Sequence, residues 1–217
     1  MNEPIVLLCD NHLLVLDKPA GMLSQGDATG DLSLLDWGKA WLKTEFDKPG
    51  NVFLGLLHRL DRPTSGVMVF ARTSKAASRL SAAIRERRLQ KRYLALCCAR
   101  PEADEGLLED WLLPGRDGDA SRIVARGTPG AQQAALRWRV RETLPAGVLC
   151  EVELLTGRKH QIRAQFAHRG AALCGDRRYG ASRPFRPGAI GLNAERLVFP
   201  HPIGGDPVEV HSQQPFP

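Results

Sequence analysis

The sequence predicts an α+β fold in which a mixed, mainly antiparallel central sheet is flanked by helices and loops. Short apolar or alternating runs, typical of strands, outnumber the amphipathic runs that are typical of helices. The two kinds of run do not alternate regularly, as they would in a doubly wound parallel sheet. Because no internal repeat or low-complexity linker divides the chain, we expect a single domain over residues 1–217.

The first predicted elements are a hairpin, a helix and a buried strand. Residues 5–8 and 13–16 are apolar runs separated by two turn-forming residues, which indicates a β-hairpin. Apolar residues recur at helical spacing over residues 32–46, and a Lys-Pro-Gly-Asn stretch then ends this helix. Residues 67–71 are almost entirely apolar, which is typical of a strand that is buried on both faces.

Two further helices are predicted later in the chain. One begins at Thr73 and Ser74, whose hydroxyl groups can cap its first turn. The other can be capped by Thr156 and ends at Gly170. The apolar residues expected to face the core are Ala77, Leu80 and Ile84 in the first of these helices, and Ile162 and Phe166 in the second.

The remaining predicted strands follow from alternating or apolar runs. Residues 101–130 are polar and rich in glycine and aspartate, so we expect long loops there. The strands are expected at residues 91–98, 136–141, 148–155, 196–199 and 208–211.

The charge of the chain is concentrated in two segments. The formal net charge is +6, and residues 72–92 and 158–186 hold 16 of the 30 lysines and arginines. Concentrated positive charge is expected of a protein that binds nucleic acid. A solvated basic surface with no such partner explains the composition equally well.

The termini and the cysteines indicate where the protein acts. The N-terminus lacks the basic segment of a signal peptide, and no apolar stretch is long enough to span a bilayer, so we expect no membrane association. The five cysteines are odd in number and form no Cys-x-x-Cys pair. This pattern argues against disulfides and structural zinc, and it predicts a reducing, cytoplasmic location.

The segment HRLDRPTSG at residues 58–66 is the strongest candidate for a catalytic site. Asp61 lies between Arg59 and Arg62, and nearby positive charge favours its ionised form. An ionised carboxylate can act as a nucleophile or a general base. Pro63 and Gly66 favour a turn before the buried strand, so a turn aspartate that bonds its own backbone is the alternative.

Two further segments carry polar groups that could take part in chemistry. In TGRKHQIR at residues 156–163, Lys159 and Arg163 would share one face of a helix, and Arg163 could pair with a carboxylate. A solvated basic helix face is the alternative. In KRYLA at residues 91–95, Tyr93 could stack on a base or transfer a proton, although strand tyrosines more often simply pack. The histidines have no ligand-like spacing, and nucleotide-binding motifs are missing, so we expect no metal and no nucleotide cofactor.

Taken together, these three segments resemble the RluA-type family of RNA pseudouridine synthases. They occur in the order found in that family. Shorter matches are DKPAG at residues 17–21, GDRRYG at residues 175–180 and a late LVFPHP at residues 197–202. The resemblance implies the pseudouridine synthase catalytic fold in a short form, without the S4 domain of some members.

The resemblance also implies a reaction and a role for each matched residue. The enzyme would isomerise uridine within ribosomal or transfer RNA, as a monomer and without a cofactor. Asp61 would be the nucleophile, Tyr93 would stack on the base and help to remove the C5 proton, and Arg163 would pair with Asp61. Arg59 would fill the gap left by the flipped uridine. The other expected RNA-binding residues are His58, Lys91, Arg92, Arg158, Lys159 and His160.

Other readings stay open on the sequence alone. Asn193 stands where the family usually has histidine, which puts a local contact in doubt but none of the catalytic positions. An RNA-binding or RNA-chaperone protein on the same fold would use Asp61 only to brace arginines. A hydrolase using His58 and Asp61 would need a metal or a second carboxylate, and the sequence offers neither at a suggestive spacing.

Overall fold

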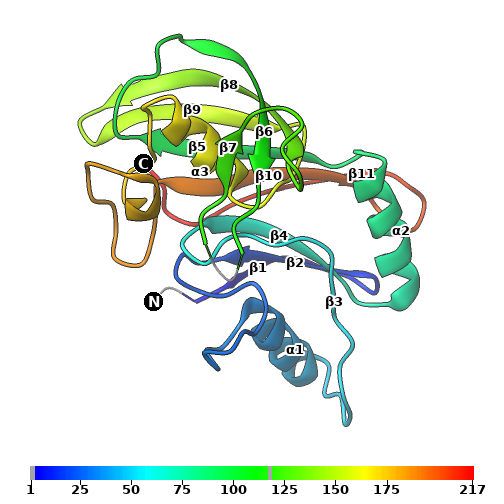
Figure 1. The fold of residues 1–217 in the computed structure, drawn as a ribbon. Helices are drawn as coiled ribbons and strands as arrows, with labels where there is room; N and C mark the ends of the chain where they lie inside the picture. Colours follow the sequence, from blue (N-terminus) through cyan, green and yellow to red (C-terminus); the bar gives the residue numbers. More distant parts are fainter. Residues whose placement is uncertain (1–2, 117–118) are drawn as a thin grey trace. The chain divides into compact units, whose positions relative to one another are not determined.

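The computed structural model describes residues 3–116 and 119–217, and Figure 1 shows their helices and strands. The chain folds into two compact units. The terminal unit comprises the described residues of Met1–Gln90 and Ala194–Phe216. The central unit comprises those of Lys91–Asn193, with Pro217.

The terminal unit contains a sheet and two helices. Its elements are β1 (Ile5–Cys9), β2 (Leu13–Lys18), α1 (Leu34–Glu45), β3 (Gly55–Leu56), β4 (Ser65–Ala71), α2 (Ser74–Arg85), β10 (Leu192–Pro200, whose first two residues belong to the central unit) and β11 (Pro207–His211). The strands follow one another in the order β1-β2-β4-β10-β11, and β3 also pairs with β4. The pairs β1–β2, β2–β4, β3–β4 and β10–β11 are antiparallel.

Local sequence signals set the first elements of this unit. The carboxylate of Asp10 accepts hydrogen bonds from the backbone amides of His12 and Leu13 at 2.6 and 2.7 Å, which closes the predicted hairpin. The hydroxyl groups of Ser33 and Thr73 cap α1 and α2 by accepting bonds from the third residue beyond them. The cap at Thr73 confirms the expected start of the second helix.

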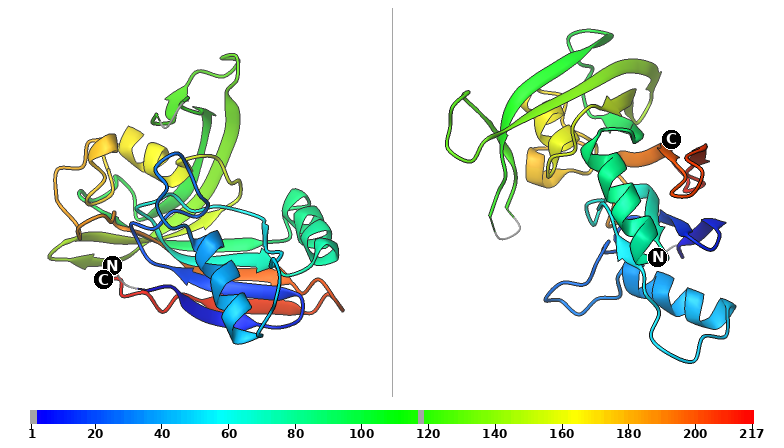
Figure 2. Two further views of the ribbon diagram at one scale, coloured as in Figure 1. Left: turned by 90° about the horizontal axis from the view of Figure 1, so that it is seen from below. Right: turned by 90° about the vertical axis from the view of Figure 1, so that its right-hand side faces the viewer.

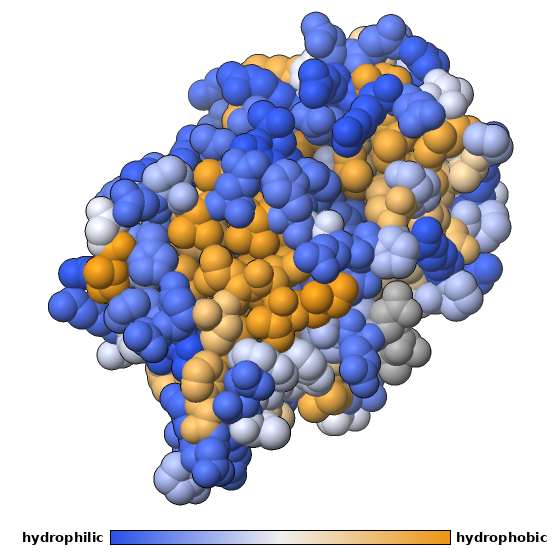
Figure 3. Space-filling view, turned by 180° about the vertical axis from the view of Figure 1, so that it is seen from behind, coloured by the Kyte–Doolittle hydropathy of each residue, from blue (hydrophilic) through white to orange (hydrophobic). Residues whose placement is uncertain are grey.

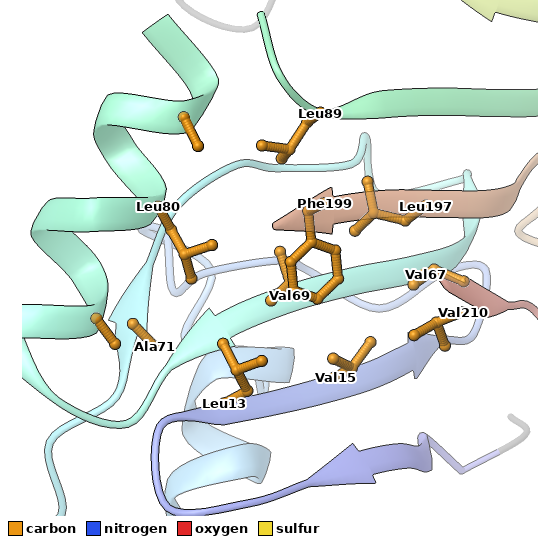
Figure 4. Packing of buried hydrophobic residues seen from close by; sticks show 12 residues of the cluster. Leu13, Val15, Val67, Val69, Ala71, Leu80, Leu89, Leu197, Phe199 and Val210 are labelled. Atoms are coloured by element: carbon orange, nitrogen blue, oxygen red, sulfur yellow. The ribbon is translucent and has the colours of Figure 1, made fainter. Parts of the chain in front are cut away.

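Side chains alternate along β2 and β4, and every residue of both strands is buried, so both faces of the sheet are covered. The two helices cover opposite faces. Leu80 of α2 packs with Leu13, Val69 and Phe199 in one buried cluster, shown in Figure 4. The α1 helix lies on the other face, as Figure 2 shows, where a side chain at Gly38 would collide with Leu54. The strand over residues 67–71 is therefore buried on both faces, as predicted.

The central unit consists of antiparallel strands with one α-helix packed on them. Its elements are β5 (Gln90–Cys97, whose first residue belongs to the terminal unit), β6 (Glu105–Leu113), β7 (Arg122–Val124), β8 (Gln132–Leu144), β9 (Gly147–Leu154), α3 (Gln161–His168) and the 3₁₀ helix η1 (Arg177–Tyr179). The strand order is β5-β9-β8-β6-β7. The α3 helix packs by Phe166, whose ring meets Trp138 of β8 edge to face at 5.8 Å.

These units confirm the predicted fold class and correct two of its details. Residues 101–130 contain the expected loops, but the strands β6 and β7 also lie there, and β6 pairs with β8. The alternation in β6 was hidden by its acidic residues, which lie on both faces: Glu109 is exposed, whereas Asp110 is on the same face as the buried Leu108. The third helix starts at Gln161, and Thr156 does not cap it. The expectation of one catalytic domain stays a prediction.

The surface and the cysteines complete the description. On the face that Figure 3 shows, apolar areas lie among polar side chains. In residues 3–116 and 119–217, no helix is long and apolar enough to cross a membrane. All five cysteines are thiols, four of them buried. The largest apolar side chains exposed in the structure are Leu32, Phe46, Phe53, Leu107 and Ile203.

Candidate active site

Asp61 lies in the terminal unit, on the loop that connects β3 to β4. The backbone amide of Thr64 donates to the carbonyl of Asp61 at 3.0 Å, so residues 61–64 form a turn. The side chain of Asp61 is half-buried, and β4 begins directly after the turn. Gly66 has a φ of +120°, and a side chain there would collide with the backbone of Ala194 in β10. A rigid strand therefore fixes one end of the loop.

The side chain of a buried lysine donates hydrogen bonds to the backbone of this turn and of the segment that follows β2. Lys18 is fully buried, and its Nζ donates to the carbonyls of Pro19, Met22 and Arg62 at 3.1, 2.8 and 3.1 Å. Desolvation lowers the pKa of Lys18 to about 7, while the negative charge of Asp61 acts in the opposite direction. Our reasoning from the sequence gave Lys18 no role, although it lies in the DKPAG match.

The other residue of that match with a clear role is Asp17. Its buried carboxylate accepts bonds from the hydroxyl of Ser212 and from the amides of Gln213 and Gln214. Burial raises the pKa of Asp17 against the effect of these donors. Asp17 therefore fastens the C-terminal segment to β2, next to the lysine that supports the turn.

Ser24 fixes the loop on the side that precedes Asp61. Its hydroxyl donates to the carbonyl of Leu60 at 2.6 Å and accepts from the amide of Leu60 at 3.1 Å. Both backbone groups of Leu60 are thus satisfied by one buried side chain. The backbone on both sides of Asp61 is held by groups in residues 18–24.

The charged neighbours of Asp61 have different surroundings. Arg62 donates from Nε to the carbonyl of Gly21 and forms an exposed ion pair with Asp31 at 2.7 Å. The side chain of Arg59 is exposed. His58 lies beside β4, where its Nε2 accepts a bond from the amide of Val69 at 3.1 Å, so Nε2 carries no proton in this arrangement.

The KRYLA segment forms the start of β5 in the central unit. Tyr93 is buried, and Lys91 points to the same side of the strand because side chains alternate. Burial lowers the pKa of Lys91. Arg92 points to the opposite side, where it pairs with Glu151 of β9 at 3.4 Å. The expected part of Arg92 in RNA binding stays a prediction.

Arg163 is a buried residue of α3 and forms a two-point ion pair. Its Nε and Nη2 donate to the two carboxylate oxygens of Asp176 at 2.7 and 2.9 Å. The two side chains are only 5% and 1% exposed, so this pair is shielded from water. The expectation of a carboxylate partner for Arg163 is met within the central unit by Asp176. The expected pairing with Asp61 joins the two units and stays a prediction.

The prediction that Lys159 and Arg163 share a helix face is wrong. His160 adopts the left-handed conformation, with a φ of 57° and a ψ of 23°, so α3 begins only after it. Lys159 is turned away, and its Nζ donates to the carbonyl of Gly115 at 2.9 Å. A sequence pattern at helical spacing does not reveal a break in the backbone.

The loop before α3 is organised by Gln161. Its Oε1 accepts from the hydroxyl of Thr156 at 2.8 Å and from the amide of Arg158 at 3.0 Å. Its Nε2 donates to the carbonyl of Ala135 on β8 at 3.0 Å. Arg158 is half-buried and donates from Nε to the carbonyl of Gln133. The loop thus presents a basic side chain while its backbone is fixed to the sheet.

A metal centre would need several side chains that can share a metal ion. Within residues 3–116 and 119–217, no three side chains of His, Cys, Asp or Glu are grouped as metal ligands. The groups expected to do chemistry are the carboxylate of Asp61 in one unit, and the phenol of Tyr93 and the guanidinium of Arg163 in the other.

The fold and these residues match one class of enzyme. The model of the family described as RNA pseudouridylate synthase matches residues 12–168, well over half of the chain. The chain belongs to this family. Ribosomal large subunit pseudouridine synthase D of Xanthomonas campestris is 32% identical over 97% of this chain. Ribosomal large subunit pseudouridine synthase C of Escherichia coli K12 is 31% identical over 96% of this chain. These names confirm the resemblance to the RluA-type group.

The solved structures agree on the fold. Human RNA pseudouridylate synthase domain containing 1 superposes with a TM-score of 0.77 at 25% identity, over 99% of this chain and 85% of that one. Human RNA pseudouridylate synthase domain containing 4 superposes with a TM-score of 0.79 at 24% identity, over 97% of this chain and 88% of that one. At this identity the similarity shows the fold alone. The chain spans 66% of the length of the two bacterial relatives, so the expected short form stays a prediction.

Proposed function

We propose that the protein is an RNA pseudouridine synthase, an isomerase that converts uridine within structured RNA to pseudouridine. The observation that carries the proposal is the family match, which includes Asp61, Tyr93 and Arg163. Relatives over nearly the whole chain are named for the large ribosomal subunit, so ribosomal RNA is the substrate we favour over transfer RNA.

The proposed reaction exchanges one bond between base and ribose for another. The bond from the ribose C1′ to the uracil N1 breaks, the base turns, and a bond from C1′ to C5 forms. C5 loses its proton and N1 gains one, so the product is an isomer of uridine. In our proposal Asp61 is the nucleophile, and its half-buried position on a fixed turn suits a group that must reach a substrate. Tyr93 stacks on the base and helps to take the C5 proton.

Arg163 and the basic residues complete the proposed site. Arg163 stabilises the carboxylate of Asp61, because a guanidinium favours a nearby anion. Arg59 fills the gap left by the flipped uridine, for which its exposed side chain is suited. The groups proposed to contact the RNA elsewhere are His58, Lys91, Arg92, Arg158, Lys159 and His160.

The wider setting follows from the same reasoning. We propose that both units together form one catalytic domain over residues 1–217. It acts as a monomer on RNA in the cytoplasm, with no metal and no nucleotide cofactor. Free thiols in all five cysteines support a reducing compartment.

The test is the substitution Asp61→Asn, which keeps the shape of the side chain and removes its charge. Pseudouridine formation is measured by tritium release from large-subunit ribosomal RNA labelled at C5 of its uridines. We expect a loss on the order of a thousandfold or more, since the nucleophile is removed. Asp31→Asn is the matched control, because Asp31 is an exposed aspartate of the same unit that pairs with Arg62.

Two outcomes would contradict the proposal. If the unaltered protein binds this RNA but forms no pseudouridine in ribosomal or transfer RNA, the protein is an RNA-binding or RNA-chaperone protein on the same fold. If Asp61→Asn retains full activity, the reaction stands but the role of Asp61 is wrong.

A further inference from the structure

Tyr179 lies against the guanidinium of Arg163 and has no part in the site described so far. Its ring centroid is 5.0 Å from Cζ of Arg163, within the range of a cation–π contact. Tyr179 ends the 3₁₀ helix η1, three residues after Asp176, the ion-pair partner of Arg163. One short segment therefore supplies two contacts to the same guanidinium.

The two contacts restrain different motions of Arg163. Asp176 engages one edge of the planar group through Nε and Nη2, and Tyr179 covers a face. A planar group held at an edge and on a face cannot rotate freely about its last bonds.

The hydroxyl of Tyr179 is itself fixed by two partners. It donates to the carbonyl of Ser121 at 3.0 Å, and Nδ1 of His160 lies 3.0 Å from the same oxygen. Since a phenol has one proton, donation to the carbonyl leaves its oxygen to accept from His160, whose Nδ1 then carries the hydrogen. The hydroxyl therefore ties the ring to the start of β7 and to the residue that precedes α3.

Further bonds connect the same groups to the loop before α3. The buried hydroxyl of Ser121 donates to the carbonyl of Lys159 at 2.8 Å, and Nζ of Lys159 donates to the carbonyl of Gly115. The left-handed backbone of His160 turns its ring toward Tyr179 at the point where the helix begins. The backbone around Arg163 and the ring that covers it are thus parts of one network.

We propose that Tyr179 is a positioning residue, which holds the guanidinium of Arg163 by its ring and is itself held by His160 and Ser121 through its hydroxyl. The inference rests on the proposed function, because it concerns the residue that stabilises the reacting carboxylate. It also changes the expected role of His160 from a direct RNA contact to a support for Tyr179.

Two substitutions separate the ring from the hydroxyl. Tyr179→Phe keeps the ring and loses both hydroxyl bonds, and Tyr179→Leu loses the ring as well. We expect kcat to fall about tenfold for the first, as for one lost hydrogen bond, and about a hundredfold for the second, as for a misplaced catalytic group. The KM for RNA should stay within about twofold, since neither change removes a contact to RNA.

The matched control is Phe185→Leu. Phe185 is also a ring beside an arginine of the central unit, with its centroid 5.4 Å from the guanidinium of Arg186, but neither residue belongs to the site. We expect wild-type kcat for this variant. A general loss of packing around η1 would lower the activity of both leucine variants.

A second readout does not depend on activity. In the wild-type protein the Nε proton of Arg163 should give a sharp NMR signal that exchanges slowly with water, because it is buried and bonded to Asp176. The signal should exchange faster in Tyr179→Leu, with a smaller change in Tyr179→Phe and none in Phe185→Leu.

The inference is overturned if folded Tyr179→Leu keeps kcat within about twofold of wild type. It is also overturned if KM rises while kcat is unchanged, since Tyr179 would then be an RNA contact. An inactive wild-type protein would refute the proposed function instead. The NMR exchange would then still show whether Tyr179 holds Arg163, and an unchanged signal in Tyr179→Leu would refute that as well.

Discussion

The Asp61 turn of the terminal unit and the Arg163 cluster of the central unit position a functional side chain in opposite ways. Around Asp61 the support reaches the backbone: Lys18 bonds three carbonyls, and Ser24 bonds both groups of Leu60. Around Arg163 the support reaches the side chain itself, through Asp176 at its edge and Tyr179 on its face.

The difference follows from what each group has to do. A nucleophile must leave its own oxygens accessible, so the protein can fix it only through the chain that carries it. A guanidinium that acts by its charge works best in a site shielded from water, where its interaction with an anion is stronger. Such burial requires a partner to offset the desolvation of the charge. The four predictions below test this contrast.

The largest effect on stability is expected at the side-chain support. Asp176→Asn should lower the free energy of unfolding by about 4 kcal/mol, because it leaves the Arg163 guanidinium buried without its counter-charge. Urea denaturation followed by circular dichroism measures the change. Arg163 and Asp176 are only 5% and 1% exposed, so water cannot replace the lost partner.

The matched control for this change is another ion pair of the central unit. Arg169 follows α3 and forms a similar two-point pair with Asp110, but its side chain is 35% exposed. Asp110→Asn should lower the free energy of unfolding by only about 1 kcal/mol, because water can solvate Arg169. Equal losses at the two pairs would show that burial does not distinguish them.

Removing the hydrogen bonds that Lys18 makes to the backbone should lower the free energy of unfolding less than Asp176→Asn does. Its effect should be concentrated in the turn that carries Asp61. Lys18→Met replaces the ammonium by an apolar group of similar length and leaves the carbonyls of Pro19 and Met22 without this donor. We expect a loss of about 3 kcal/mol. Amide hydrogen exchange should also become faster in residues 57–64.

The control for Lys18→Met is Lys75→Met, since Lys75 is an exposed lysine of the same unit. It should leave both stability and exchange unchanged. If Lys18→Met lowers stability evenly across the terminal unit, without a local change in residues 57–64, Lys18 supports the core and not the turn.

Lys18 should also make stability depend on pH. Its pKa is lowered from 10.5 to about 7 in the folded protein, so between these values the unfolded chain binds a proton that the folded chain lacks. Unfolding then takes up a proton, and raising the pH opposes it. The free energy of unfolding should rise by about 2 kcal/mol from pH 7 to pH 9.

The contribution of Lys18 is isolated by the difference between wild type and Lys18→Met across this range. The difference in free energy of unfolding between the two proteins should change by the same amount, about 2 kcal/mol, because all other titrating groups are common to both. A difference that stays constant from pH 7 to pH 9 would show that Lys18 keeps its ordinary pKa in spite of its burial.

The smallest effect on stability is expected at Arg59, whose side chain is exposed. Arg59→Ala should change the free energy of unfolding by less than about 0.5 kcal/mol. Under the proposed function it should still lower pseudouridine formation, because Arg59 fills the gap left by the flipped uridine. A large loss of stability would place Arg59 among the supports of the turn and would contradict its proposed role.

Local signals made much of the fold predictable. Thr73 caps α2 because a hydroxyl satisfies the free amides of a first turn wherever that turn forms. The apolar run at residues 67–71 required a strand covered on both faces, and α1 and α2 provide the cover. Within residues 101–130 the strand β6 was missed, because acidic residues interrupt its apolar run and its pairing with β8 joins residues distant in the chain.

By itself, the sequence determined the fold class, the family and the turn that carries Asp61, because turns, caps and alternating runs depend on neighbouring residues. Only the tertiary structure decided that Lys18 holds that turn and that Asp176 and Tyr179 hold Arg163. The reason is physical: burial and hydrogen-bond partners are set by residues distant in the chain. Spacing along the sequence could not show the break at His160 that separates Lys159 from Arg163.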